Sequence, residues 1–149
     1  MRKALLIIMV VVLAIASVAA MTSCSRIMSF FKGSNPAGVY KFESVTIKGW
    51  NYETTYNIGD APQHGDGAVF TEDSVILTLN KDGTYEFEDN SPVLNTTTTG
   101  TWEIAKDDEG NKYIKFDNEN FTANYDKESL TFCYNNLDLI YYTYKMKKA

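Results

Sequence analysis

The stretch VILTLNKDGTYEFE, residues 75–88, is the clearest structural signal in this chain of 149 residues. Apolar side chains fall on every second position before and after its centre, which is the period of a β-strand with one buried face. The central Lys81-Asp82-Gly83 has turn composition, and Gly83 suits the positive φ of a tight hairpin. The stretch therefore predicts a β-hairpin.

The same two-residue period recurs along most of the chain. Strands are predicted around residues 40–47, 51–58, 102–104, 114–116, 121–125, 130–134 and 139–146. Turn residues separate most of them, and longer loops are predicted at 59–67 and 89–97. No segment after Pro36 has helical periodicity over three turns.

The first predicted strand changes phase in its middle. Tyr40 and Phe42 occupy even positions, whereas Val45 and Ile47 occupy odd ones. A bulge or sharp bend near residues 43–44 would return both pairs to the same face.

These features predict an all-β fold of eight or nine strands in one domain. An antiparallel meander of this size leaves exposed edges unless it closes, so an up-and-down barrel is preferred. The alternative is a β-sandwich of the immunoglobulin type. That fold would bring longer crossover connections, and the Cys-Trp-Cys arrangement of immunoglobulin domains is missing here.

The first 23 residues have the layout of a secretory signal peptide. Arg2 and Lys3 precede an uncharged stretch, residues 4–20, and Met21-Thr22-Ser23-Cys24 follows it. This junction resembles the lipobox of bacterial lipoproteins, with Met21 in place of the usual leucine. The resemblance implies that Cys24 is acylated and anchors the protein to a membrane of the bacterial cell envelope, the outer membrane being preferred. Residues 24–37 would then be a tether and residues 38–149 the folded domain.

The tethered domain has motifs in common with a known family. The runs GVYKF at residues 38–42, LTLNKDGTY at 77–85 and GTWEI at 100–104 resemble the lipocalin-like domain of many bacterial lipoproteins. The resemblance extends over residues 38–147. It implies a small barrel tethered to a membrane, and it assigns no catalytic residue to this chain.

Charge and residue counts narrow the function. Loss of Arg2 and Lys3 with the signal peptide leaves 12 basic against 19 acidic residues, so we expect no nucleic-acid partner. The chain has one histidine and two cysteines, which leaves too few residues for most histidine triads, multi-ligand zinc sites or disulfide frameworks. We therefore expect no enzyme, metal or cofactor.

Aromatic side chains are the candidate binding residues. The chain has ten tyrosines, eight phenylalanines and two tryptophans, and many fall on the predicted inward face. They either line a cavity or simply fill the barrel, because eight strands enclose a space that large residues can occupy completely. The candidates are Tyr40, Phe42, Tyr85, Phe87, Trp102, Phe116, Phe132, Tyr134, Tyr142 and Tyr144.

Three other features have simpler structural explanations. His64 lies in a glycine-rich loop whose aspartates are typical of turns, and the acidic residues at 107–111 lack the ligand spacing of a calcium loop. Cys133 is predicted on a strand face opposite Phe132, as a small buried residue or an odd thiol.

The sequence thus predicts a non-catalytic, membrane-anchored barrel that binds a small apolar or amphipathic molecule. The alternative is a structural or interaction lipoprotein whose loops 59–67 and 89–97 contact a protein partner. Interior volume separates the two, because side chains that meet across the axis would favour the scaffold.

Overall fold

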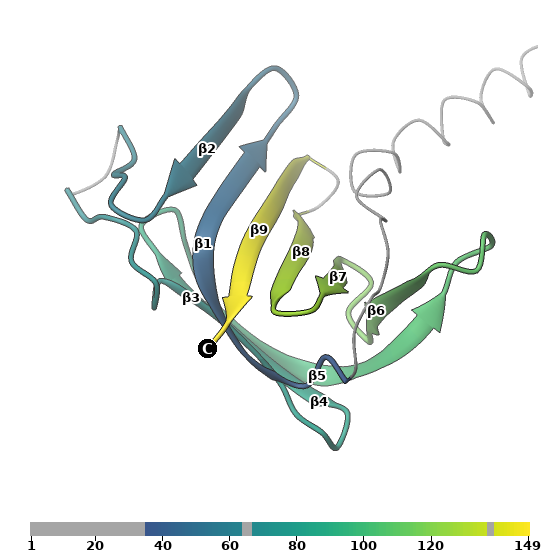
Figure 1. Cartoon of the computed structure of the whole chain (residues 1–149). Helices are drawn as coiled ribbons and strands as arrows, with labels where there is room; N and C mark the ends of the chain where they lie inside the picture. Colours follow the sequence, from purple (N-terminus) through teal and green to yellow (C-terminus); the bar gives the residue numbers. More distant parts are fainter. Residues whose placement is uncertain (1–34, 64–66, 137–138) are drawn as a thin grey trace, which may run out of the picture.

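The computed structural model describes residues 35–63, 67–136 and 139–149. No helix long and apolar enough to cross a bilayer occurs in these ranges. They form strands that follow one another around the molecule (Figure 1). The strands are β1 (Gly38–Lys48), β2 (Glu53–Asn57), β3 (Val75–Leu79), β4 (Thr84–Ser91), β5 (Leu94–Lys106), β6 (Lys112–Phe116), β7 (Phe121–Asp126), β8 (Ser129–Asn136) and β9 (Ile140–Lys148).

The strands form one antiparallel sheet that closes on itself. Each of β3 to β8 pairs with the next strand along the chain, and β1 pairs with β3 on one side and β9 on the other. Strand β2 is additional and pairs with the second half of β1. The predicted up-and-down barrel is confirmed, and its closure excludes the two separate sheets of a sandwich.

The predicted bulge in β1 is also confirmed. Its pairing with β9 shifts register between Phe42 and Ser44. As a result, Tyr40, Phe42, Val45 and Ile47 are all buried on the inner face. The bend also lets one strand serve two neighbours, since β3 pairs with residues 38–41 and β2 with residues 44–48.

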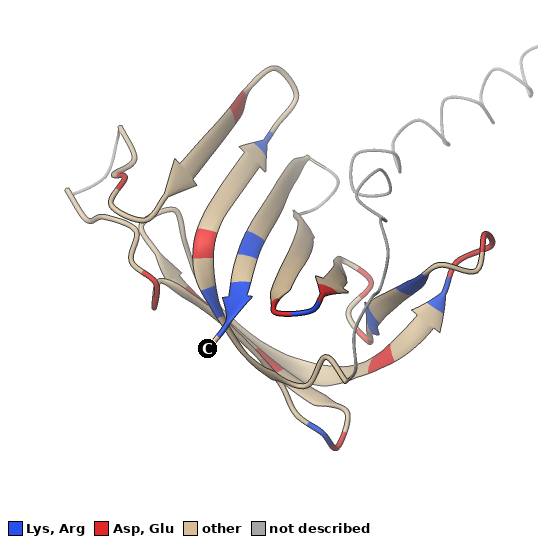
Figure 2. Ribbon diagram, viewed as in Figure 1, with Lys and Arg blue, Asp and Glu red and all other residues tan. Residues whose placement is uncertain are grey.

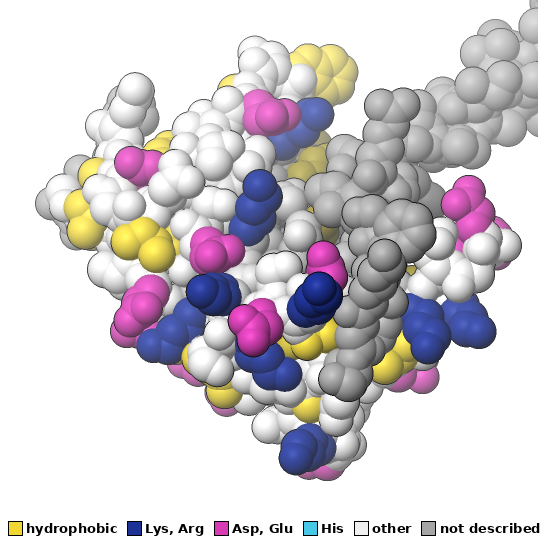
Figure 3. Space-filling model, viewed as in Figure 1, with side chains coloured by type: hydrophobic (Ala, Val, Ile, Leu, Met, Phe, Trp, Pro, Cys, Tyr) yellow, Lys and Arg dark blue, Asp and Glu magenta, His cyan; other side chains and the backbone are white. Residues whose placement is uncertain are grey.

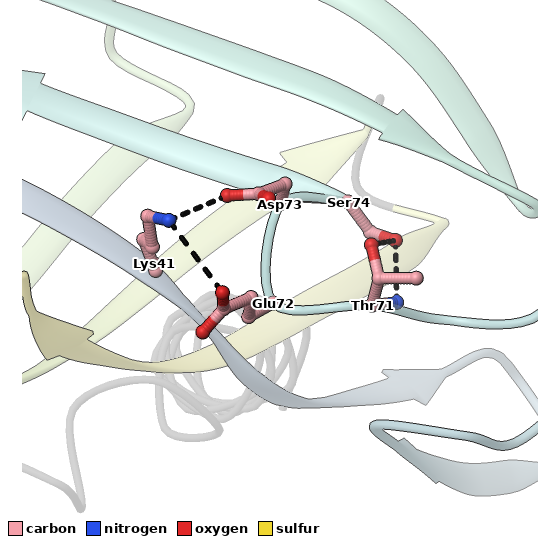
Figure 4. A network of polar contacts seen from close by, with 5 residues as sticks. All are labelled: Lys41, Thr71, Glu72, Asp73 and Ser74. Atoms are coloured by element: carbon pink, nitrogen blue, oxygen red, sulfur yellow. Dashed lines mark hydrogen bonds and ion pairs between the residues drawn. The ribbon is translucent and has the colours of Figure 1, made fainter.

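The segment that enters β3 is held against β1 where β1 changes partner (Figure 4). The Lys41 Nζ lies 2.7 Å from Asp73 Oδ1 and 3.7 Å from Glu72 Oε1. Within the segment, the Thr71 backbone N–H donates to the Ser74 hydroxyl at 2.8 Å. The hydrogen bond to Asp73 is the main reason that the pKa of Lys41 is raised.

The barrel has two distinct ends. The chain enters β1 at Gly38, next to the β3–β4, β5–β6 and β7–β8 turns, and we call this the entry end. The far end carries the β1–β2 turn, the β4–β5 turn, the β6–β7 turn and the link from β8 to β9. In Figure 2, charged residues lie at several turns, among them the acidic β5–β6 turn, and at positions along the strands.

The loop predicted at residues 89–97 is wrong. Strand β4 continues to Ser91 and β5 begins at Leu94, so only Pro92 and Val93 separate them. Polar residues in this segment are typical of a loop. In the structure, however, Asp89 and Ser91 face inward and are buried at positions where a strand usually has apolar side chains. The four threonines at residues 96–99 are β-branched, and each of them pairs with a residue of β4. The scaffold alternative thereby loses one of its two loops.

Candidate ligand-binding site in the barrel

The ten aromatic candidates divide into a buried group and a half-buried pair. Trp102 and Tyr134 are half-buried and pack against the core. The other eight are at most 8% exposed and belong to one hydrophobic cluster. The buried group is Tyr40, Phe42, Tyr85, Phe87, Phe116, Phe132, Tyr142 and Tyr144.

Rings from opposite walls meet in the middle of the barrel. The ring of Phe87 on β4 lies 4.7 Å from that of Phe132 on β8 and 5.5 Å from that of Phe121 on β7, between centroids. Phe116 on β6 lies 5.6 Å from Phe132. Such contacts between strands that are not neighbours in the sheet indicate that side chains fill this level of the barrel.

Trp102 is less enclosed than the sequence suggests. Strand β4 pairs with β5 only as far as Thr101, so Trp102 lies where β5 and β6 extend beyond β4. Its indole Nε1–H donates to the Asn80 carbonyl at 3.1 Å. Ile104, two residues further, is 45% exposed, although its alternation phase is inward. A surface depression of about 470 Å³ includes Trp102, Phe116 and charged residues of β5 and β6.

The inner faces of β4 and β5 differ in burial. On β4, Tyr85, Phe87, Asp89 and Ser91 are buried. Their direct cross-strand partners on β5 are all half-buried, although paired residues share one face of a sheet. These partners are Gly100, Thr98, Thr96 and Leu94.

The pairing of β5 explains this difference. Its residues 94–101 pair with β4, whereas the ladder to β6 begins only at Trp102. Within the described residues, the first part of β5 therefore has a strand neighbour on one side only. We call the inner face of this segment, residues 94–98, the β5 shelf; it lies toward the far end.

Three tyrosines and one aspartate form a polar group near the β5 shelf. The rings of Tyr134, Tyr142 and Tyr144 stack in sequence, with centroid separations of 5.6 and 6.2 Å. The Tyr144 hydroxyl donates to Asp89 Oδ2 at 2.6 Å, and the Ser91 backbone N–H donates to Asp89 Oδ1 at 2.9 Å. Asp89 is fully buried, in the half of the core that lies toward the far end.

Burial raises the pKa of Asp89, although the hydrogen bonds from Ser91 and Tyr144 act in the opposite direction. Burial, together with the neighbouring carboxylate, raises the pKa of Tyr144 well above its ordinary value. None of the ion pairs within the described ranges involves Asp89. The charged form of Asp89 is therefore disfavoured in the folded protein.

This shift predicts a pH dependence of stability. Folded Asp89 binds its proton more tightly than the unfolded residue, which titrates near about pH 3.9. Its contribution is most favourable below that pH and is lost as pH rises through the raised pKa. In urea unfolding, we expect the stability of the native protein relative to Asp89→Asn to decrease as pH is raised from about 4. A difference that is independent of pH would contradict this account.

A second buried polar group lies at Tyr85. Among the residues that the structure describes, none forms a hydrogen bond with its hydroxyl. Burial raises the pKa of Tyr85 to about 12, and the Asp117 carboxylate adds to this shift. Asp117 lies against Gly100, where any Cβ would collide with its carboxylate. The glycine at position 100 thus leaves room for an acidic group at the edge of the core.

Exposed apolar side chains gather at the far end. Trp50, in the β1–β2 turn, is 99% exposed and Leu139, before β9, is 69% exposed. Lys48 pairs with Tyr141, so these two turns are neighbours. Figure 3 shows hydrophobic atoms at the tip of the β1–β2 hairpin. Tyr52, which is 48% exposed, lies beside Gly49 in the same turn.

The remaining sequence candidates are placed as follows. Asp107 accepts hydrogen bonds from the backbone N–H groups of Glu109 and Asn111, as expected for a hairpin turn. Cys133 is buried, and its Sγ lies 3.9 Å from the Thr143 Oγ1. No group of metal-binding side chains occurs in the part of the chain described above. His64 and Cys24 lie outside the described residues.

Sequence reasoning missed two residues that shape the interior. Phe70 stacks between Phe42 and Tyr56, with centroid separations of 5.0 and 5.4 Å, yet it follows a loop and no alternation marks it. Asp89 is the first residue of the loop that the sequence predicts at 89–97, whereas the structure places it within β4. The one available signal was its phase, since it continues the inward positions of Tyr85 and Phe87.

Comparison with known proteins identifies no relative of this chain. No protein-family model matches the chain, and neither a curated protein nor a solved structure was found to match it.

Proposed function

We propose that this protein is a non-catalytic, membrane-anchored barrel that binds a small apolar or amphipathic molecule at its far end. The observation that supports this most is the half-buried β5 shelf directly beside the buried inner face of β4, its neighbour in the sheet. Inward-facing side chains that keep access to solvent are the groups that a ligand can cover. Ligand sites combine apolar walls with a few polar groups, and the β5 shelf presents Leu94 together with the hydroxyls of Thr96 and Thr98.

The proposed site and the first residue of β1 lie at opposite ends of the barrel. Gly38 opens β1 at the entry end, and the chain that would carry acylated Cys24 precedes it. The β5 shelf and the exposed turns are at the far end. Several acyl chains at Cys24 would provide a stable anchor, since each buried methylene contributes about 0.8 kcal/mol.

A neutral environment-sensitive dye tests the proposal. Nile red should bind the Cys24→Ser protein, which lacks the acyl chains, with roughly micromolar affinity, near −8 kcal/mol. Its fluorescence should increase on binding and the thermal unfolding midpoint should rise. If neither this dye nor any flat aromatic compound shifts the midpoint at millimolar concentration, ligand binding is contradicted.

A scaffold function is the second candidate. The rings that meet at Phe87 and Phe132 leave the middle of the barrel filled, and Trp50 is almost completely exposed. Exposed aromatic residues are frequent in protein interfaces. In this case the turns of the far end would contact a protein partner of the cell envelope.

A further inference from the structure

We infer that the ligand carries an amine or another cationic hydrogen-bond donor, which Asp89 receives at the base of the β5 shelf. This inference rests on the proposed function and specifies its ligand class.

The position of Asp89 is the first argument. Asp89 pairs directly with Thr96 across β4 and β5, so both side chains leave the same face. Directly opposed residues have Cβ atoms about 4.5 to 5.5 Å apart. Thr96 is half-buried and belongs to the β5 shelf, whereas Asp89 is fully buried. A group bound against Thr96 would therefore be close to the Asp89 carboxylate.

The surroundings of Asp89 are the second argument. Its cross-strand partners are Val75 on β3 and Thr96 on β5, neither of which carries charge. The other facing groups are Ser91, Tyr142 and Tyr144, together with Tyr134 beyond them. Burial without a neighbouring cation disfavours the ionised form of Asp89, and a cationic group of a ligand placed beside it would stabilise that form.

The stacked tyrosines are the third argument. Ring faces attract cations, and a carboxylate beside aromatic rings is a common arrangement for binding amines. Tyr134 is half-buried and stacks on Tyr142, which stacks on Tyr144, whose hydroxyl contacts Asp89. This series of rings leads from the accessible part of the core to the carboxylate. An apolar body would lie against the rings while the cationic group contacts Asp89.

Three probes with the same carbon skeleton test the inference. Phenylbutylamine, phenylbutanol and phenylbutyrate each carry a phenyl ring on a four-carbon chain and differ in the oxidation state and charge of the group at its end. Their affinities can be measured by calorimetry with the full chain in nanodiscs of zwitterionic lipid, with empty nanodiscs as the blank. We expect the amine to bind at least about tenfold more tightly than the carboxylate, with the alcohol between them.

Two variants separate the buried charge from the general charge of the protein. Asp89→Asn should abolish the preference for the amine. Glu88→Gln removes the same charge from the adjacent residue of β4, whose phase is opposite, and should leave the preference unchanged. Tyr144→Phe keeps the Asp89 carboxylate and should retain the preference for the amine. This variant can be measured even if Asp89→Asn does not fold.

The outcomes are distinguishable. Equal affinity for all three probes, or an equal loss in Glu88→Gln and Asp89→Asn, would overturn the inference and leave ligand binding intact. A preference for phenylbutyrate would overturn it as well. If neither these probes nor Nile red binds, the proposed function itself fails.

Discussion

Phe87→Ala is expected to lower the free energy of unfolding by about 3 to 5 kcal/mol, the usual cost of emptying a large core site. Phe87 is fully buried, and its ring contacts rings from three other strands, β7, β8 and β9. Its removal would therefore leave a cavity that one neighbour cannot fill. Chemical denaturation of the purified protein measures the effect.

Glu86→Ala is the matched control for this prediction. Glu86 precedes Phe87 on the same strand and points to the outer, exposed face. Its replacement should change stability by at most about 0.5 kcal/mol. Similar small effects from both substitutions would show that the barrel does not depend on the central ring cluster.

Cys24→Ser is expected to abolish acylation and release the protein from membranes. The prediction follows from the uncharged stretch and the small residues that precede Cys24. Membrane fractionation and the intact mass of the native protein measure it. Cys133→Ser, at the other cysteine, should leave fractionation unchanged. An unmodified native Cys24, or membrane association that persists in Cys24→Ser, would contradict the lipoprotein assignment.

Much of the fold could be predicted because one face of nearly every strand is buried. Alternation located the hairpin of Leu77 and Tyr85, and the phase change after Phe42 located the bulge. These signals depend only on residues that are close together in the chain, so a single sequence is enough to detect them. The turn at Gly83 is equally local, since its φ of 85° favours glycine.

The interior could be predicted less well, because burial of polar groups depends on distant partners. Asp89 is acceptable inside the barrel since Tyr144, 55 residues away, donates a hydrogen bond to it. No local pattern contains that information. In the same way, the sequence places Trp102 on the inner face, but only the end of the β4 ladder at Thr101 explains why it is half-buried.

The paired variants Thr98→Trp and Thr97→Trp provide the most direct measurement of ligand binding at the far end. Thr98 faces inward on the β5 shelf, whereas Thr97 is exposed on the outer face of the same strand. Both variants introduce tryptophan, at adjacent positions of one strand, so Nile red titration of the two compares the inner face of the strand with its outer face. We expect Thr98→Trp to weaken binding at least about tenfold, more than 1.4 kcal/mol, and Thr97→Trp to leave it unchanged. Equal affinities in the two variants would contradict a binding site on the β5 shelf.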